Sequence, residues 1–85
     1  MHRTTENFWR FYRSLPESVR NIADKNFKLL KQNQRHPSLQ FKRVGHLWSA
    51  RAGLAHRALA VEDGGDFIWV WIGNHDEYEK MIKGR

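Results

Sequence analysis

Two arginines on either side of a glycine are the residues of this chain best suited to chemistry. Residues 48–61 have the pattern of two short strands that meet at Gly53, with Arg51 near the end of the first and Arg57 near the start of the second. Glycine supplies the positive φ that a tight hairpin needs. A tight turn brings the two guanidinium groups close together, which is costly unless an anion lies between them. The spacing therefore predicts a phosphate site.

Four more residues could contribute to such a site. Lys42 and Arg43 lie in the preceding predicted strand and can converge with the two arginines if the strands pair as a meander. A basic cluster of this kind binds phosphates through charge and bidentate hydrogen bonds. His75 follows the last predicted strand, where its imidazole could act as a general acid or base. Tyr78, one turn further on, could stack against a base or donate a hydrogen bond.

Each of these residues also has a structural interpretation. Basic side chains at a surface commonly pair with nearby acids, here those of segment 62–66, and this explains Lys42 and Arg43 as well as a phosphate site does. His75 and Tyr78, each taken alone, are better explained as a helix cap and as packing against the sheet. The binding role is favoured for the arginine pair, because it brackets a tight turn beside small residues.

Metal chemistry is not indicated. The chain has five histidines: His2, His36, His46, His56 and His75. Their spacing along the sequence is not that of metal ligands, and no acidic ligand pattern accompanies them. No glycine-rich phosphate loop and no serine or cysteine nucleophile motif is present. We therefore expect neither a metal nor another cofactor.

Length and charge limit the class of protein. Eighty-five residues form one domain, 1–85, with a modest core. The net charge is +6, but residues 1–61 hold twelve of the fifteen bases and only three of the nine acids. A basic body suits a polyanion such as nucleic acid, or an acidic protein partner. With no cysteine, no membrane-length apolar run and no signal-peptide pattern, a soluble intracellular protein without a membrane role is expected.

The N-terminal part predicts a short edge strand at 1–5 and then a helical hairpin. The first helix has apolar residues at helical spacing between 8 and 15, with Thr4 or Thr5 as its N-cap. Pro16 separates it from the second helix, for which Ser14 is a plausible cap. The second helix carries an apolar stripe of Val19, Ile22, Ala23, Phe27 and Leu30.

The rest of the chain predicts a meander of strands at 39–44, 47–52, 55–62 and 67–72, followed by a short helix at 76–83. Every residue from 67 to 72 is apolar, which marks a strand covered on both faces and central to the sheet. Helices packed on a small antiparallel sheet define an α+β fold.

The ordered set of segments resembles the RelE/ParE superfamily, the toxins of type II toxin–antitoxin systems. The likeness runs from about residue 4 to 82 and is carried by 15–16, 36–42, 48–51, 56–58 and 71–78. It implies a cytoplasmic protein with two helices against an antiparallel sheet. It also implies a cognate antitoxin, whose acidic segment would cover the basic face.

In the RelE-like branch the resemblance implies cleavage of mRNA on the ribosome without a metal, by attack of the ribose 2′-hydroxyl on its own phosphate. Arg51 and Arg57 would stabilise the transition state. His75 or Tyr78 would handle protons or stack the base, and Lys42 or Arg43 would hold the flanking RNA; these residue roles are implied by the resemblance.

Two alternatives remain open within the same superfamily. Many members read Ile-Gly-His-Arg after the last strand, whereas this chain has Ile72-Gly73-Asn74-His75, so the histidine lies one place later and the arginine is missing. A ParE-like chain that inhibits DNA gyrase without catalysis is the first alternative. An inactive relative that only binds protein or RNA is the second.

Overall fold

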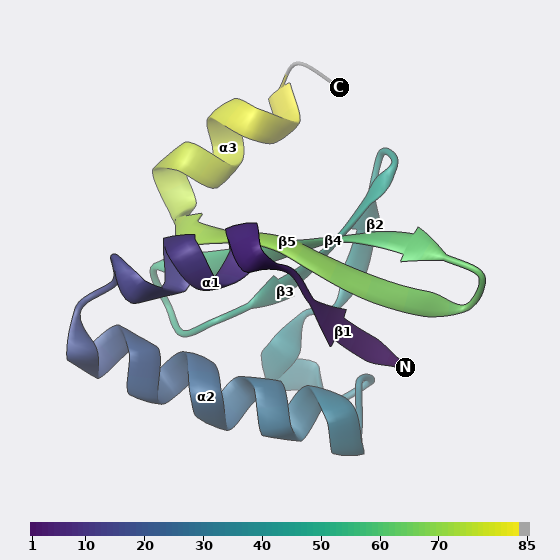
Figure 1. Cartoon of the computed structure of the whole chain (residues 1–85), viewed down its shortest axis with the longest axis horizontal. Coiled ribbons are helices and arrows are strands. Elements are labelled where there is room, and N and C mark those ends of the chain that lie inside the picture. The colour runs from purple at the N-terminus through teal and green to yellow at the C-terminus, as the bar shows by residue number, and fades with distance from the viewer. Residues whose placement is uncertain (84–85) are drawn as a thin grey trace.

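A computed structural model describes residues 1–83 and contains one five-stranded sheet and three α-helices (Figure 1). In chain order the elements are β1 (His2–Thr4), α1 (Glu6–Arg13), α2 (Glu17–Gln32), a 3₁₀ turn η1 (Pro37–Leu39), β2 (Lys42–Val44), β3 (Leu47–Arg51), β4 (His56–Asp63), β5 (Asp66–Asn74) and α3 (His75–Lys83). The predicted α+β class, with an N-terminal helical hairpin and a short C-terminal helix, is confirmed. In Figure 1, α2 lies below the sheet and α3 above it.

The strands from β2 to β5 form the predicted antiparallel meander, in the sheet order β1-β5-β4-β3-β2. The predicted N-terminal edge strand is confirmed, and it pairs parallel to β5, with Thr4 opposite Trp69. The sheet is therefore mixed, and β4 rather than the last strand is its middle strand. Sequence pattern could not give this order, because the N-terminal strand is short and polar.

The first helix begins at the predicted cap. The Thr5 hydroxyl accepts a hydrogen bond from the Phe8 amide at 3.1 Å and donates one to the Trp69 carbonyl of β5 at 3.0 Å. One side chain thus starts α1 and fixes it to the sheet. The prediction that Ser14 caps the second helix is wrong: Ser14 ends α1, where its hydroxyl donates to the Arg10 carbonyl, and Pro16 precedes α2.

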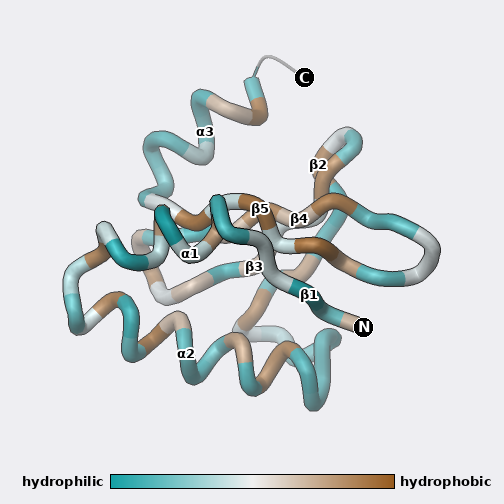
Figure 2. Tube along the Cα trace, in the orientation of Figure 1, coloured by the Kyte–Doolittle hydropathy of each residue, from teal (hydrophilic) through white to brown (hydrophobic). Residues whose placement is uncertain are grey.

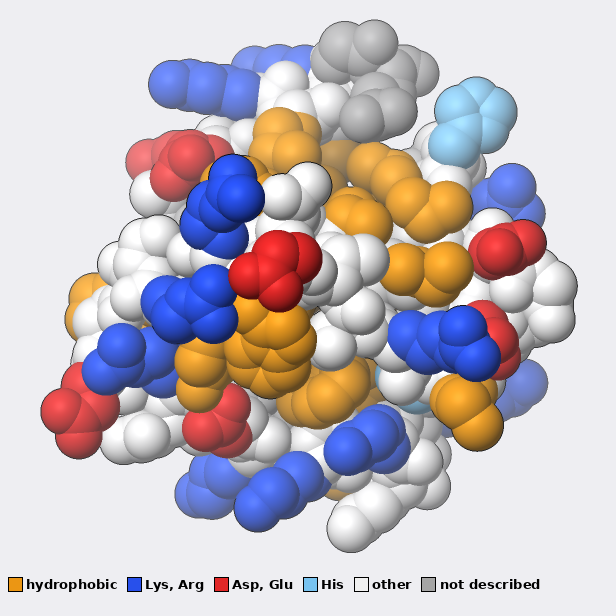
Figure 3. Space-filling model, viewed as in Figure 1, with side chains coloured by type: hydrophobic (Ala, Val, Ile, Leu, Met, Phe, Trp, Pro, Cys, Tyr) orange, Lys and Arg blue, Asp and Glu red, His pale blue; other side chains and the backbone are white. Residues whose placement is uncertain are grey.

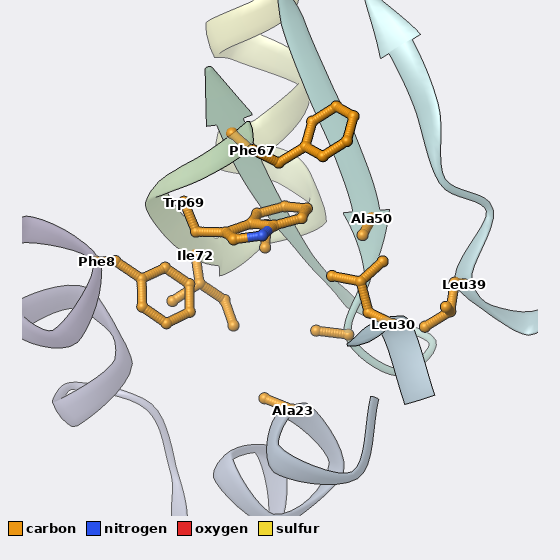
Figure 4. Close-up of a cluster of buried hydrophobic side chains, with 11 residues drawn as sticks. Phe8, Ala23, Leu30, Leu39, Ala50, Phe67, Trp69 and Ile72 are labelled. Atoms are coloured by element: carbon orange, nitrogen blue, oxygen red, sulfur yellow. The ribbon is translucent and has the colours of Figure 1, made fainter. Parts of the chain in front are cut away.

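One face of the sheet, here called the α2 face, holds the main core. Apolar and polar residues alternate along α2, and the apolar ones turn toward the sheet (Figure 2). Trp69, 1% exposed, lies in the middle of the cluster, between Phe8 of α1 and Leu30 of α2 (Figure 4). Its indole N–H donates to His2 Nδ1 at 3.1 Å, so the largest core side chain is also satisfied in its hydrogen bonding.

The opposite face, here called the α3 face, holds a smaller cluster of Leu47, Leu59, Trp71 and Tyr78. A register shift between Leu59 and Ala60 adds one residue to β5 and turns Trp71 away from Trp69, onto this face. The prediction that the last strand is covered on both faces is therefore confirmed, by a bulge that the apolar run did not indicate.

Most strands and the last helix differ by one or two residues at an end from the predicted bounds, α3 beginning at His75 rather than 76, and the start of β2 differs by three. Leu39 lies in η1 and not in a strand, since Pro37 opens a 3₁₀ turn, so β2 covers only 42–44 of the predicted 39–44. Asn74 caps α3 by accepting from the Glu77 amide at 2.8 Å, while its amide nitrogen donates to the Glu77 carboxylate. Within residues 1–83, none of the helices has the length and apolar character needed to cross a membrane.

Candidate nucleic-acid interface

The predicted hairpin places its two arginines side by side. Arg51 of β3 lies directly opposite Arg57 of β4, and the turn is closed by a 3.0 Å hydrogen bond from the Ala52 amide to the His56 carbonyl. Gly53 has a φ of +92°, and a Cβ there would lie 3.1 Å from Ile22 of α2. Opposed residues of paired strands share a face of the sheet, so both arginine side chains start from the α3 face.

Arg57 is the most unusual residue of this face. It is only 8% exposed, yet its Nε and Nη1 have no hydrogen-bond partner within the described residues. Its Nη2 donates to the Gln40 side-chain oxygen at 2.6 Å, and the Tyr78 ring centre lies 5.3 Å from the guanidinium. A buried charge is normally paired, because leaving water without a partner is costly. Here the neighbours are a neutral amide and an aromatic ring.

Surface pairing with the acids of segment 62–66 does not account for the arginines, and two of these three acids have other partners. Asp66 lies 3.4 Å from the N-terminal ammonium and 3.5 Å from Arg3. Glu62 accepts a hydrogen bond from the Trp48 indole at 3.0 Å. No carboxylate among residues 1–83 forms an ion pair with Arg51 or Arg57. The positive charge on this face is therefore uncompensated in the described part of the chain.

The register separates the two basic residues of β2. Lys42 lies opposite Ser49 and so starts from the α3 face, together with the arginines. Arg43 lies opposite Trp48 and starts from the α2 face, where its Nε donates to the Gly45 carbonyl. The prediction that all four basic residues converge on one face is therefore wrong for Arg43, because adjacent strand residues point to opposite faces.

Helix α3 brings His75 and Tyr78, the two predicted site residues with ring side chains, to the region of Arg57. Tyr78 is 3% exposed and packs on the sheet, with its ring against Arg57. The His75 ring centre lies 5.6 Å from that of Tyr78, so Tyr78 lies in contact with both. His75 is 43% exposed, and its Nε2 lies 3.6 Å from the Glu79 carboxylate. The geometry places Tyr78 beside the buried arginine and His75 at the outer side of Tyr78.

Two residues of this region were not predicted from the sequence. Ser49 is 0% exposed, its hydroxyl has no hydrogen-bond partner within residues 1–83, and it is the diagonal neighbour of Arg57 across β3 and β4. Gln40 binds the guanidinium directly. Ser49 could have been suspected as a lone hydroxyl in an apolar strand. Gln40 gave no comparable signal, since a polar residue beside a short strand is ordinary.

We call this arrangement the Arg57 site: Arg57 with Gln40, Ser49 and Tyr78 around it, and with Arg51 and Lys42 on the same face. It has donors and positive charge, and no acceptor carboxylate within residues 1–83 forms an ion pair with it. Its chemistry suits one oxyanion, such as a phosphodiester or a phosphorane-like transition state. In the described part of the chain no three His, Asp or Glu side chains gather as metal ligands.

A second basic surface lies away from this site. Figure 3 shows Lys and Arg side chains along the lower margin of the molecule, over α2. This surface carries the exposed residues Lys25, Lys28 and Lys31. Because it is solvated and on the other side of the sheet, it can add charge for a large polyanion but cannot join the Arg57 site.

Solved structures with the same fold are toxins of toxin–antitoxin systems. A chain of the RelB–RelE antitoxin–toxin complex of Methanococcus jannaschii superposes with a TM-score of 0.72 at 11% identity, over 93% of this chain and 96% of that one. The isolated Escherichia coli RelE toxin gives 0.62 at 12% identity, over 99% and 96%. The YoeB/ParE toxin of Agrobacterium tumefaciens gives 0.63 at 13% identity, over 87% and 96%.

These similarities lie in the structure. No protein-family model matches the sequence, and no curated protein matches it. The fold is that of the RelE and ParE toxins, as the sequence resemblance implied.

Proposed function

We propose that this chain is the toxin of a toxin–antitoxin pair and that it cleaves RNA at the Arg57 site. The observation that carries the proposal is the buried guanidinium of Arg57. Within residues 1–83, two of its nitrogens have no hydrogen-bond partner and no carboxylate forms an ion pair with it. A residue kept for packing alone would be better replaced by an apolar one. A residue kept to meet a transient negative charge has to stay unpaired until the substrate arrives.

The proposed reaction is an internal transfer within RNA. The ribose 2′-oxygen forms a bond to the adjacent phosphorus, and the bond from phosphorus to the 5′-oxygen of the next nucleotide breaks. The 2′-hydroxyl loses a proton and the leaving 5′-oxygen gains one, so the products are a 2′,3′-cyclic phosphate and a 5′-hydroxyl. Charge increases on the non-bridging oxygens in the transition state, and Arg57 with Arg51 would stabilise it there.

The other residues of the site have supporting roles in this proposal. Lys42 would hold a neighbouring phosphate, since it starts from the same face. Tyr78 lies against Arg57 and would place the guanidinium or stack on a base, and His75 beside it would transfer a proton. An mRNA on the ribosome is the proposed substrate, in the cytoplasm, and the charges for catalysis come from side chains without a metal cofactor.

An antitoxin with an acidic segment is the proposed partner. Three of the structures with this fold are of toxin–antitoxin complexes, from Methanococcus jannaschii, Mycobacterium tuberculosis and Pyrococcus horikoshii. The net charge of +6 and the uncompensated arginines on the α3 face favour a partner that brings carboxylates. Such a segment would inhibit the toxin by occupying the positions that RNA phosphates need.

Induction in cells, with transcript ends mapped, tests the proposed activity. The wild type should arrest translation and leave messages cut to new 5′ ends, and Arg57→Ala should leave them intact. Arg43→Ala is the matched control, because it removes an arginine from the other face and should leave cutting unchanged. Arrest with intact transcripts would overturn the nuclease proposal.

Non-enzymatic inhibition of gyrase is the second candidate. The histidine after the last strand lies one place later than in many members of the superfamily and the arginine is missing, which favours a site without the family's catalytic set. One relative in fold bears the name YoeB/ParE. This candidate predicts DNA-damage signalling and continued toxicity when His75 and Tyr78 are both replaced.

A further inference from the structure

Four aliphatic side chains form a row across the α3 face, at the end of β3 away from the Arg57 site. Val44 of β2 lies opposite Leu47 of β3, Leu47 lies opposite Val61 of β4, and Val61 lies opposite Ile68 of β5. We call these four residues the aliphatic row. We propose that the aliphatic row is the docking surface for an amphipathic helix of the antitoxin, with the acidic edge of that helix toward the Arg57 site. This inference rests on the proposed antitoxin partner, to which it adds a binding surface and a secondary structure.

The aliphatic row is partly open to solvent. Val61 is 40% exposed, and Val44 and Ile68 are partly exposed, whereas Leu47 is 8% exposed and belongs to the smaller cluster of this face. Figure 3 shows hydrophobic side chains gathered in the upper right of the molecule, in the area between α3 and β2 of Figure 1. Single exposed apolar residues are ordinary, but apolar residues aligned across four strands form a contiguous patch. Such a patch indicates a surface that a partner covers.

The chemistry and length of the row suit a protein helix. All four side chains are aliphatic, so the row offers neither an aromatic ring on which an RNA base can stack nor a donor for a phosphate. Four strands spaced by about 4.8 Å make the row about 14 Å long. Apolar residues at i, i+3, i+7 and i+10 of a helix span about 15 Å along one side. The apolar stripe of a short amphipathic helix therefore matches the row in length.

The charges on the two sides of the row differ, and they set the orientation of the helix. On the side toward the Arg57 site, the next residue of β2 on this face is Lys42, and the Arg51 and Arg57 pair lies beyond it. On the other side, the next residue of β4 on this face is Asp63. A helix with carboxylates along one edge therefore fits with that edge toward Lys42, where it also blocks the approach to Arg57. A second copy of this chain would bring its own net charge of +6 to this basic surface, which disfavours self-association.

Fluorescence anisotropy with a synthetic peptide tests the docking surface. The probe is a labelled helical peptide of about twenty residues, with leucines at i, i+3, i+7 and i+10 and glutamates along one edge of that stripe. Val61→Asp should weaken its binding by about tenfold or more, because the change puts a carboxylate into the apolar contact. Leu54→Asp is the matched control: Leu54 is 87% exposed in the Gly53 hairpin, away from the row, and the change should alter the affinity by less than about twofold.

A pair of charge reversals tests the orientation of the helix. Lys42→Glu should weaken binding of the peptide about fivefold, because it replaces attraction to the acidic edge by repulsion. Arg43→Glu reverses the same charge on the other face and should have a smaller effect. Equal effects of the two changes would contradict the orientation. Should Val61→Asp fail to fold, Val61→Thr replaces it, since threonine keeps the branched shape that suits a strand and should still weaken binding about threefold.

The outcomes separate the docking surface from the proposed nuclease. Equal affinity of the wild type and the Val61 variant, or no binding of the peptide to either, would overturn the aliphatic row as the antitoxin surface. A dimer of the chain alone that Val61→Asp dissociates would make the occupant a second copy, and a loss of RNA binding in that variant would make it RNA; either result overturns the proposal. Val61→Asp should cut transcripts in cells as the wild type does. If neither cuts them while the peptide still binds the wild type and not the variant, the nuclease is wrong and the docking surface stands.

Discussion

The two faces of the sheet treat polar atoms in opposite ways. On the α2 face the Trp69 indole donates to His2, and the His2 Nε2 donates to Gln34 at 3.0 Å, so each buried polar atom of this chain of contacts is satisfied. On the α3 face Ser49 and Arg57 leave three buried polar atoms without hydrogen-bond partners among residues 1–83. Buried polar groups without partners destabilise a fold and call for an explanation. The α2 face is built for stability, and the α3 face is the one for which we propose a ligand.

The largest expected effect on stability lies on the α2 face. Trp69→Ala removes the central side chain of the main core and should lower the free energy of unfolding by about 3–5 kcal/mol, because it leaves a large cavity. Chemical denaturation measures this. The total free energy of unfolding of so small a domain is not much larger than this loss, so the variant should be close to unfolded. A small effect would contradict the assignment of this face as the stable core.

The largest expected effect on activity lies on the α3 face. Arg57→Met should reduce RNA cleavage by about a hundredfold or more, because it removes the charge that meets the transition state. The free energy of unfolding should stay the same or rise, since an unpaired buried charge is replaced by an apolar side chain of similar length. Cleavage assays and denaturation on the same preparation check both. Lower stability with unchanged activity would place Arg57 in the structural core.

A smaller pair of changes compares the faces at adjacent positions. Ser49→Ala removes an unpartnered hydroxyl from the α3 face and should raise the free energy of unfolding by up to about 1 kcal/mol. Ala50→Ser adds a hydroxyl to the α2 face, where Ala50 is buried, and should lower it by about 1–3 kcal/mol. If both changes destabilise equally, the hydroxyl of Ser49 has a partner in solution.

The smallest expected effect is a pH dependence carried by His2. Burial, together with the N-terminal ammonium, lowers the pKa of His2 below its ordinary value of 6.5, although the hydrogen bond to Gln34 opposes this. The unfolded chain then binds the proton first, so the stability given by neutral His2 is present above about pH 6.5 and is lost as the pH falls below it. Denaturation at a series of pH values measures this, and in His2→Gln the free energy of unfolding should depend less on pH across this range. The exposed His46→Gln is the control, and a loss of the slope there would contradict the assignment.

Much of the fold could be predicted because its signals are local. The Gly53 hairpin, the Thr5 cap and the apolar run of β5 each follow from a few neighbouring residues. Two other features of the fold do not follow from neighbouring residues. The bulge that turns Trp71 onto the α3 face lies inside an uninterrupted apolar run, where alternation gives no register. The parallel pairing of β1 joins residues more than sixty positions apart.

The site could be predicted only as far as the hairpin defines it. Arg51 and Arg57 share a face because the turn fixes their register, and this followed from the sequence. Arg43 was placed on the wrong face, because the predicted cluster set aside the alternation that puts Lys42 and Arg43 on opposite faces of β2. Gln40 reaches Arg57 from seventeen residues away through an uncommon backbone conformation, which no pattern of residue types indicates.

A crystal structure of this protein with a short 2′-O-methylated RNA tests the role of the α3 face most directly. The expected result is one phosphodiester bound by the guanidinium of Arg57, with Lys42 near an adjoining phosphate. RNA held on the lysines of α2 instead, away from Arg57, would contradict it.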